Sequence, residues 1–212
     1  MTALVQFDHV RKDYRGASAP ALIDVTFDIF ERDRIALMGR SGSGKSTVLN
    51  LIAGLDEATA GEVRWPLYGH PVATDIGLAF QSPSLIPWLT VEENVRLPLL
   101  ISTVTRPGDV LGLLSRLGLS DLASKLPSEL SGGQAQRVAL ARAMVTTPRL
   151  LLADEPSGQL DHETANRVLD MLDGWADDSG TALVIATHDP MVAASTQRCW
   201  TLDHGHLAEI PV

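Results

Sequence analysis

Short apolar runs alternate with helix-like stretches along this chain, a pattern typical of an α/β protein with a mostly parallel sheet. Residues 5–10 and 22–30 alternate apolar and polar side chains, as half-buried strands do. Four shorter apolar runs predict buried strands. They lie at residues 34–38, 76–80, 150–153 and 182–186.

Helical spacing marks two stretches between these strands. In Lys45–Ala53 the apolar positions recur at spacings of three and four residues, and Val110–Leu119 is also helix-like. The second stretch lies in a leucine-rich segment that several prolines interrupt. We therefore expect one domain spanning the chain, with a core formed by residues 1–82 and 131–212 and a helical subdomain formed by residues 83–130.

Composition narrows the class of protein. An apolar share of 45% and a charged share of 20% over 212 residues are those of an ordinary globular domain. The net charge of −9 argues against a nucleic-acid partner, because such surfaces cluster Lys and Arg. The one cysteine, Cys199, excludes an internal disulfide. With no leader-like start and no long apolar run, we expect a cytoplasmic polypeptide whose membrane spans, if it needs them, come from another subunit.

A glycine-rich loop joins the predicted strand at 34–38 to the helix that follows. Its residues are Gly39, Arg40, Ser41, Gly42, Ser43, Gly44, Lys45, Ser46 and Thr47. Glycines allow the backbone to wrap around phosphates with its N–H groups pointing inward, and the helix N-terminus adds partial positive charge. Lys45 is placed to reach the β and γ oxygens, and the Ser46 hydroxyl to bind Mg²⁺. A chance Gly/Ser loop would lack this strand–loop–helix setting, so the loop predicts an ATP phosphate site.

Two carboxylates follow another predicted strand. Asp154 and Glu155 come directly after the run at 150–153, at the carboxyl edge where parallel sheets bind ligands. Asp154 is expected to hold Mg²⁺ through water, and Glu155 to orient or deprotonate the attacking water. Alone, such a pair is more often a solvated strand end; beside a phosphate loop, the catalytic interpretation is favoured.

A second glycine turn opens a predicted helix. It consists of Leu130, Ser131, Gly132, Gly133 and Gln134, and Gln136–Ala143 follows. By itself the turn could be a plain helix cap made by Ser131. Together with the following helix, however, it resembles the signature motif of ABC ATPases, and the motifs named so far occur in that family's order.

The resemblance covers nearly the whole chain and implies roles for further residues. Tyr14 corresponds to an aromatic that stacks on adenine, and Gln81 to a glutamine that senses Mg²⁺ and the γ-phosphate. Asp161 corresponds to a residue that couples two ATP sites, and His188 to a histidine that contacts the γ-phosphate. Taken alone, Tyr14 could be an ordinary half-buried aromatic, and His188 a structural histidine.

The resemblance also implies a fold and partners. The fold is a P-loop NTPase core with a mostly parallel sheet, an N-terminal antiparallel portion and a helical insertion. Two cassettes, this chain with a second copy or a paralogue, would sandwich ATP head to tail, with the signature motif of one facing the phosphate loop of the other. The pair would work on membrane permease subunits at the cytoplasmic face. Residues 81–95, including Leu85, Ile86, Trp88 and Leu89, are either the docking surface or the small core of the insertion.

Subfamily features point in two directions. Leu152–Gly158 and Asn94–Leu100 resemble cassettes of the lipoprotein-releasing, macrolide-export and cell-division group, which we favour. The short segment 61–81 and Pro87–Thr90 look more like taurine, sulfonate and nitrate importers, and Arg32-Asp33 replaces the family's common Gly-Glu. A signalling cassette that drives a membrane protein to control a cell-wall enzyme stays an alternative to transport. A cassette acting on DNA or ribosomes is disfavoured by the acidic charge.

Overall fold

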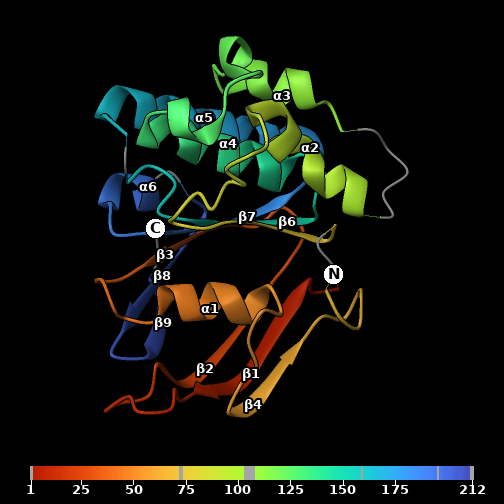
Figure 1. Ribbon diagram of the computed structural model, residues 1–212. Coiled ribbons are helices and arrows are strands. Elements are labelled where there is room, and N and C mark those ends of the chain that lie inside the picture. Colours follow the sequence, from red (N-terminus) through yellow and green to blue (C-terminus); the bar gives the residue numbers. More distant parts are fainter. Residues whose placement is uncertain (1, 72–73, 103–107, 159, 195, 211–212) are drawn as a thin grey trace. The chain divides into compact units, whose positions relative to one another are not determined.

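The computed structural model describes residues 2–71, 74–102, 108–158, 160–194 and 196–210. These residues form two compact units (Figure 1). Unit 1 comprises the described residues of Met1–Val72 and Ala182–Val212, and unit 2 those of Ala73–Thr181. No described helix combines the length and apolarity that crossing a bilayer requires.

Unit 1 contains a three-stranded antiparallel sheet in the order β2-β1-β4. Its strands are β1 (Val5–Lys12), β2 (Leu22–Ile29) and β4 (Ala60–Arg64). Phe7 of β1 pairs with Phe27 of β2 on one side and with Val63 of β4 on the other. The alternating patterns at 5–10 and 22–30 are thereby confirmed as strands, because one face of each is buried and the other is more exposed.

The second group of strands in unit 1 is mostly parallel. β3 (Arg34–Met38) lies between β7 (Ala182–Thr187) and β8 (Arg198–Asp203), and β9 (His206–Ile210) pairs antiparallel with β8. Every residue of β7 is buried, as its continuous apolar pattern predicts. A short helix, α6 (Pro190–Ala194), follows β7.

Aromatic side chains fill the core of unit 1. The rings of Phe7 and Phe27 stack with their centroids 4.3 Å apart. The ring centroid of Trp200 in β8 also lies 4.3 Å from that of Phe27. Helix α1 (Lys45–Ile52) runs between the three-stranded sheet and β3 with β8 in Figure 1. The indole N–H of Trp65 donates to the Ile52 carbonyl oxygen over 2.9 Å, which fastens the end of α1.

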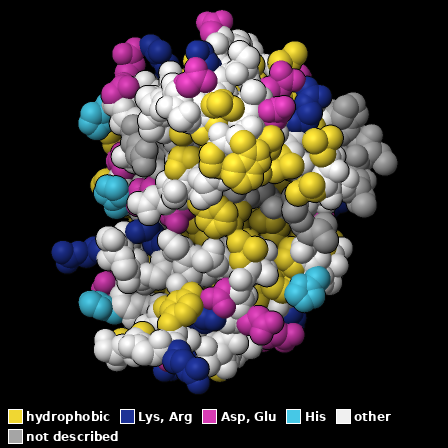
Figure 2. Space-filling view, in the orientation of Figure 1, with side chains coloured by type: hydrophobic (Ala, Val, Ile, Leu, Met, Phe, Trp, Pro, Cys, Tyr) yellow, Lys and Arg dark blue, Asp and Glu magenta, His cyan; other side chains and the backbone are white. Residues whose placement is uncertain are grey.

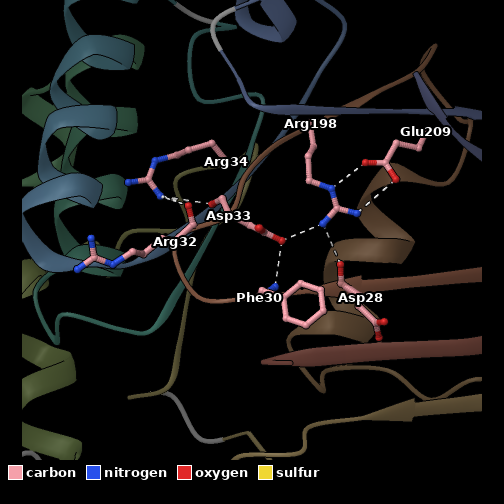
Figure 3. A network of polar contacts seen from close by, with 7 residues as sticks. All are labelled: Asp28, Phe30, Arg32, Asp33, Arg34, Arg198 and Glu209. Atoms are coloured by element: carbon pink, nitrogen blue, oxygen red, sulfur yellow. Dashed lines mark hydrogen bonds and ion pairs between the residues drawn. The ribbon is translucent and has the colours of Figure 1, made fainter. Parts of the chain in front are cut away.

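A polar network fastens the turn that leads into β3 (Figure 3). The Asp33 carboxylate accepts from the Phe30 N–H over 3.0 Å and from Arg198 over 2.9 Å. Arg198 also donates to the Asp28 carbonyl oxygen over 3.1 Å and to the Glu209 carboxylate over 2.7 and 3.3 Å. One guanidinium therefore joins β2, β8, β9 and the turn, and these bonds hold the pKa of Arg198 above its usual value despite partial burial.

Unit 2 is built on two parallel strands, β5 (Ile76–Ala79) and β6 (Leu150–Asp154). Helix α4 (Gly132–Met144) packs directly on β5. This close approach requires Gly77, because a side chain there would overlap with the Ala143 carbonyl oxygen. Helix α5 (His162–Ser179) also belongs to unit 2.

The described part of segment 83–130 is helical where it is regular. Helix α2 (Val91–Ile101) begins with a capping box in which the Thr90 hydroxyl and the Glu93 side chain bind each other's backbone N–H. Helix α3 (Val110–Arg116) is capped by Asp109, and two 3₁₀ turns follow at Ser120–Leu122 and Pro127–Glu129. The helix predicted for Val110–Leu119 is shorter than expected, because the chain turns at Gly118 with a φ of 65°.

Candidate active site

The phosphate loop of unit 1 leaves β3 after Met38 and enters α1 at Gly44. Gly44 has a φ of 108°, and a Cβ there would lie 2.6 Å from the Ala21 carbonyl oxygen, so the position favours glycine. Among the described side chains none caps α1, and its first turn contains no acidic residue. The positive end of the helix dipole therefore has no carboxylate in its own first turn, which favours an anion there.

The Lys45 side chain folds back across this loop. Its ammonium donates to the carbonyl oxygens of Gly39 and Arg40 over 2.8 and 3.3 Å, and the side chain is largely buried. The Ser43 N–H closes the loop by donating to the same Arg40 carbonyl oxygen over 3.1 Å. The result is a compact ring with a positive charge inside it. Ser41, Gly42 and Ser46 are exposed around the ring, whereas Thr47 is buried.

Tyr14 lies beside this loop. Its hydroxyl donates to the Asp56 carboxylate over 2.9 Å and lies 3.4 Å from the hydroxyl of Thr47. The residue is 42% exposed, so part of the ring faces solvent. An aromatic surface therefore stands next to the phosphate loop, where the resemblance places the adenine.

His188 is also a predicted site residue of unit 1. Thr187, the last residue of β7, pairs with Met38, the last residue of β3. His188 and Gly39 consequently follow at the same carboxyl edge, and His188 is exposed there. The Thr187 hydroxyl accepts from the Asp189 N–H over 3.0 Å, which fixes the backbone just after the histidine.

The two carboxylates lie in unit 2. Asp154 ends β6 and is 7% exposed. Glu155 has a φ of 49°, a left-handed conformation that is strained for a residue with a side chain, and its carbonyl oxygen accepts from the Gly158 N–H over 3.1 Å. Ala79 pairs with Ala153, so Gln81 follows at the same edge as the carboxylates. Gln81 is exposed.

The signature turn begins helix α4 in unit 2. The Ser131 hydroxyl accepts from the Gln134 N–H over 3.2 Å, and the Gln134 side chain accepts from the Ser131 N–H over 2.8 Å. The plain cap that the sequence allowed is thus present in the isolated chain. It leaves Gly132 and Gly133 in the first helical turn, where backbone N–H groups have no partner within the helix.

Two residues of α4, Gln136 and Arg142, have contacts in this region that their place in the predicted helix did not indicate. The side-chain amide of Gln136 donates to the Phe80 carbonyl oxygen over 3.3 Å. The Arg142 guanidinium donates to the carbonyl oxygens of Ser84 and Pro83 over 2.9 and 2.8 Å, and burial lowers its pKa. A signal was available for Arg142, which interrupts the apolar run Val138–Met144, but not for Gln136, which lies among other polar residues.

Asp161 begins helix α5. Its carboxylate accepts from the Thr164 N–H over 3.0 Å and from the Thr164 hydroxyl over 2.7 Å, and these bonds lower the pKa of Asp161. In the single chain this residue is therefore a helix cap. Gln159, two residues before it, lies outside the described residues.

The predicted site residues are divided between the units. Unit 1 holds Tyr14, the loop 39–47 and His188, whereas unit 2 holds the remaining predicted residues. These are Gln81, Ser131, Gly132, Gly133, Gln134, Asp154, Glu155 and Asp161.

The segment after Gln81 exposes one large aromatic. Trp88 is 77% exposed, while Leu85, Ile86 and Leu89 are half-buried. The fully buried Asn94 holds this segment on α2: its amide donates to the carbonyl oxygens of Ile86 and Leu89 over 3.2 and 2.9 Å. Figure 2 shows hydrophobic side chains gathered over the region of α2. The segment thus combines three half-buried apolar side chains with one exposed aromatic.

Comparison with known proteins gives consistent results. Residues 22–158 match the family model described as ABC transporter. The chain is 42% identical to the lipoprotein-releasing system ATP-binding protein LolD of Chromohalobacter salexigens, over 86% of this chain and 82% of that protein. It is 40% identical to the uncharacterized ABC transporter ATP-binding protein YbbA of Escherichia coli, over 97% of both chains.

The fold matches a solved cassette. The post-hydrolysis dimer of the ATP-binding cassette MJ0796, bound to ADP and Pi, has a TM-score of 0.88 and 34% sequence identity over 98% of this chain and 99% of that one. This match confirms the predicted α/β cassette fold. The relatives named LolD also confirm the resemblance to the lipoprotein-releasing group.

Proposed function

The chain belongs to the ABC transporter family of ATP-hydrolysing cassettes, and from that premise we propose that ATP joins two cassettes head to tail and that their closure drives a membrane permease. The chain is the ATP-binding subunit and an ATPase.

Binding of ATP begins at the phosphate loop. The loop 39–47 surrounds the phosphates with backbone N–H groups, and Lys45 moves from the carbonyl oxygens it now contacts to the β and γ oxygens. Tyr14 stacks on the adenine beside the loop. The phosphates of ATP thus bind at a charged end of the site, and its base binds at an aromatic end.

The oxygen donors fit a magnesium ion. Ser46, Gln81 and Asp154 offer hydroxyl, amide and carboxylate oxygens, the ligands that Mg²⁺ takes together with water and phosphate. The buried carboxylate of Asp154 is the charged member of this set. When bound, Mg²⁺ neutralises charge on the phosphate oxygens. Glu155 orients or deprotonates the attacking water, and His188 contacts the γ-phosphate.

Helix α4, which begins at the signature turn, supports the proposed dimer. Ser131 and Gln134 satisfy each other's backbone N–H, while Gly132 and Gly133 present their N–H groups in the first turn of α4. A γ-phosphate held by a second cassette supplies the acceptor that these groups lack within the helix. The solved cassette of 34% identity is dimeric, which supports this arrangement.

Cysteine cross-linking tests the dimer directly. Cys199 is the only cysteine in the sequence, so a Cys199→Ser background carries no competing thiol. Adding Ser41→Cys and Ser131→Cys places one thiol in the phosphate loop and one in the signature turn. We expect a covalent dimer under mild oxidation with ATP and none without it.

Each single-cysteine variant is the matched control. In a head-to-tail dimer a thiol in the phosphate loop faces the partner's signature turn, so neither single variant cross-links with itself. An equal mixture of the two cross-links. Self-linking of the single variants at the same rate, with or without ATP, would contradict the proposed arrangement.

The membrane partner is proposed to dock on residues 81–95. Trp88, which is 77% exposed, provides an apolar contact, and its neighbours are fixed by Asn94. Attachment at this surface would hold the cassette at the cytoplasmic face. In vesicles that contain the partner, cargo movement coupled to hydrolysis supports transport, and hydrolysis with no cargo movement supports the signalling alternative.

A further inference from the structure

Lys12 ends strand β1 with an ammonium group that is almost completely covered; the residue is 9% exposed. The ammonium binds the Asp56 carboxylate and donates to the Glu57 carbonyl oxygen over 2.7 Å. A largely buried cation is stable only with a charged partner and further hydrogen bonds, and Lys12 has both.

The same carboxylate holds Tyr14. One oxygen of Asp56 binds Lys12, and the other accepts from the Tyr14 hydroxyl over 2.9 Å. The Lys12 ammonium also lies over the Tyr14 ring, 4.9 Å from its centroid. The ring is therefore fixed at its hydroxyl by an anion and on one face by a cation.

The backbone around Tyr14 is fastened to the same loop. The Asp13 N–H donates to the Thr59 hydroxyl over 3.0 Å, and the Thr59 N–H donates to the Arg11 carbonyl oxygen over 2.8 Å. These bonds hold the loop that carries Asp56 against the end of β1. The loop and the ring thus keep a fixed distance from each other.

The charge of Asp56 is maintained by these contacts. Partial burial by itself would raise its pKa, but the hydrogen bonds from Lys12, the Glu57 backbone and Tyr14 outweigh burial and lower the pKa below its usual value. Asp56 is therefore ionised at neutral pH, as its ion pair with Lys12 requires.

We infer that Lys12 and Asp56 are positioning residues that set nucleotide affinity by fixing Tyr14 for the base. The ammonium covers one face of the ring, so a base stacks on the other, and a cation on one face makes the ring a better partner for the electron-rich purine. The Tyr14 hydroxyl lies 3.4 Å from that of Thr47, so the base end and the phosphate end of the site are held together. The inference rests on the proposed stacking of adenine on Tyr14.

Binding of two ligands tests the inference. ATP carries a base, whereas tripolyphosphate offers only phosphates to the loop; each is measured by displacement of a fluorescent ATP analogue. Stacking of the base on the tyrosine ring contributes to the binding free energy, and we expect Tyr14→Ala to weaken ATP binding about 10-fold. We expect Lys12→Met to weaken it about 3- to 5-fold, as loss of a cation–π contact predicts, while tripolyphosphate binding stays within about 2-fold.

Two further variants separate positioning from folding. Lys12→Arg keeps the cation, so we expect its ATP affinity to stay within about 2-fold of that of the wild type. Tyr14→Phe removes only the hydroxyl bonded to Asp56 and should weaken ATP binding about 2- to 5-fold. Arg64→Met is the matched control, since Arg64 forms an exposed ion pair with Asp8 at the other end of the same sheet.

The outcomes distinguish the two claims. If Tyr14→Ala leaves ATP affinity unchanged, the proposed stacking itself is wrong. If Tyr14→Ala weakens ATP binding while Lys12→Met and Asp56→Asn do not, stacking stands and the positioning role is overturned. Equal weakening of ATP and tripolyphosphate in Lys12→Met would also overturn it, because a general loss of structure affects both ligands.

Discussion

Arg32 and Glu155 carry side chains but adopt left-handed backbone conformations. Arg32, in the turn before β3, has a φ of 66°, and Glu155, after β6, has a φ of 49°. Such a conformation costs about 1–2 kcal/mol for a residue with a Cβ. At Glu155 the strain coincides with the proposed catalytic carboxylate, which is where strained residues tend to occur. At Arg32 it coincides with the position where the family commonly has glycine.

Arg32 therefore offers a stability prediction. Replacing it with glycine removes the strain, and the extra freedom of glycine in the unfolded chain offsets part of the gain. We expect Arg32→Gly to raise the free energy of unfolding by about 0.5–1 kcal/mol, measured by urea denaturation. The network of Figure 3 uses the backbone oxygen of Arg32, so it persists.

Arg32→Ala is the control for this prediction. It removes the same side chain but keeps a Cβ in the left-handed conformation, so it should give no gain. An equal gain in both variants would show that the side chain, and not the backbone, is responsible.

Helix α4 joins two of the predicted motifs in unit 2. It begins at the signature turn, and its Gln136 and Arg142 bind the backbone of the segment on either side of Gln81. The helix therefore connects the signature turn to the segment around Gln81 through hydrogen bonds. We assign this connection to the helix as a whole, because its N-terminus forms one motif while Gln136 and Arg142 hold the other.

Removal of Arg142 tests this connection. Arg142→Met leaves the carbonyl oxygens of Ser84 and Pro83 without their donor, and we expect a loss of about 1–3 kcal/mol in the free energy of unfolding. Arg116→Met is the control, because Arg116 forms an exposed ion pair with Asp178 at 3.3 Å and should change stability by less than about 1 kcal/mol. Equal effects of the two substitutions would mean that Arg142 does not fasten the segment.

At the scale of the whole molecule, the chain contains each motif of the family once. The loop 39–47 and the signature turn lie in different compact units of one chain. The proposed dimer makes use of both, since each ATP takes the loop from one cassette and the turn from the other. Because Lys45, Glu155 and His188 are all present, the proposed dimer needs no second cassette of different sequence.

Local patterns predicted most of the strands and the site loops. Alternation and apolar runs were sufficient for β1, β2, β3, β5, β6 and β7, because burial there follows sequence directly. β4 escaped prediction because its residues are mostly exposed and lack alternation. α5 was missed although its signal exists: Val168, Leu172, Trp175 and Ala176 recur at helical spacing behind the Asp161 cap.

Long-range polar contacts could not be predicted. Lys12 and Asp56 are 44 residues apart, and Arg198 and Asp33 are 165 apart. Nothing in the local sequence pairs them, because hydrogen-bond partners across a fold depend on how the strands are ordered. The roles of Gln81, Asp161 and His188 came from the family resemblance, and they stay predictions.

The central claim is that ATP holds two cassettes together and that Glu155 is needed to hydrolyse it. The most direct test is the solution mass of Glu155→Gln, with and without Mg-ATP, beside its ATPase rate. We expect a monomer of 22.8 kDa that doubles in mass when Mg-ATP is added, with hydrolysis abolished. A variant that binds ATP but stays at 22.8 kDa, or one that hydrolyses ATP at the wild-type rate, would contradict it.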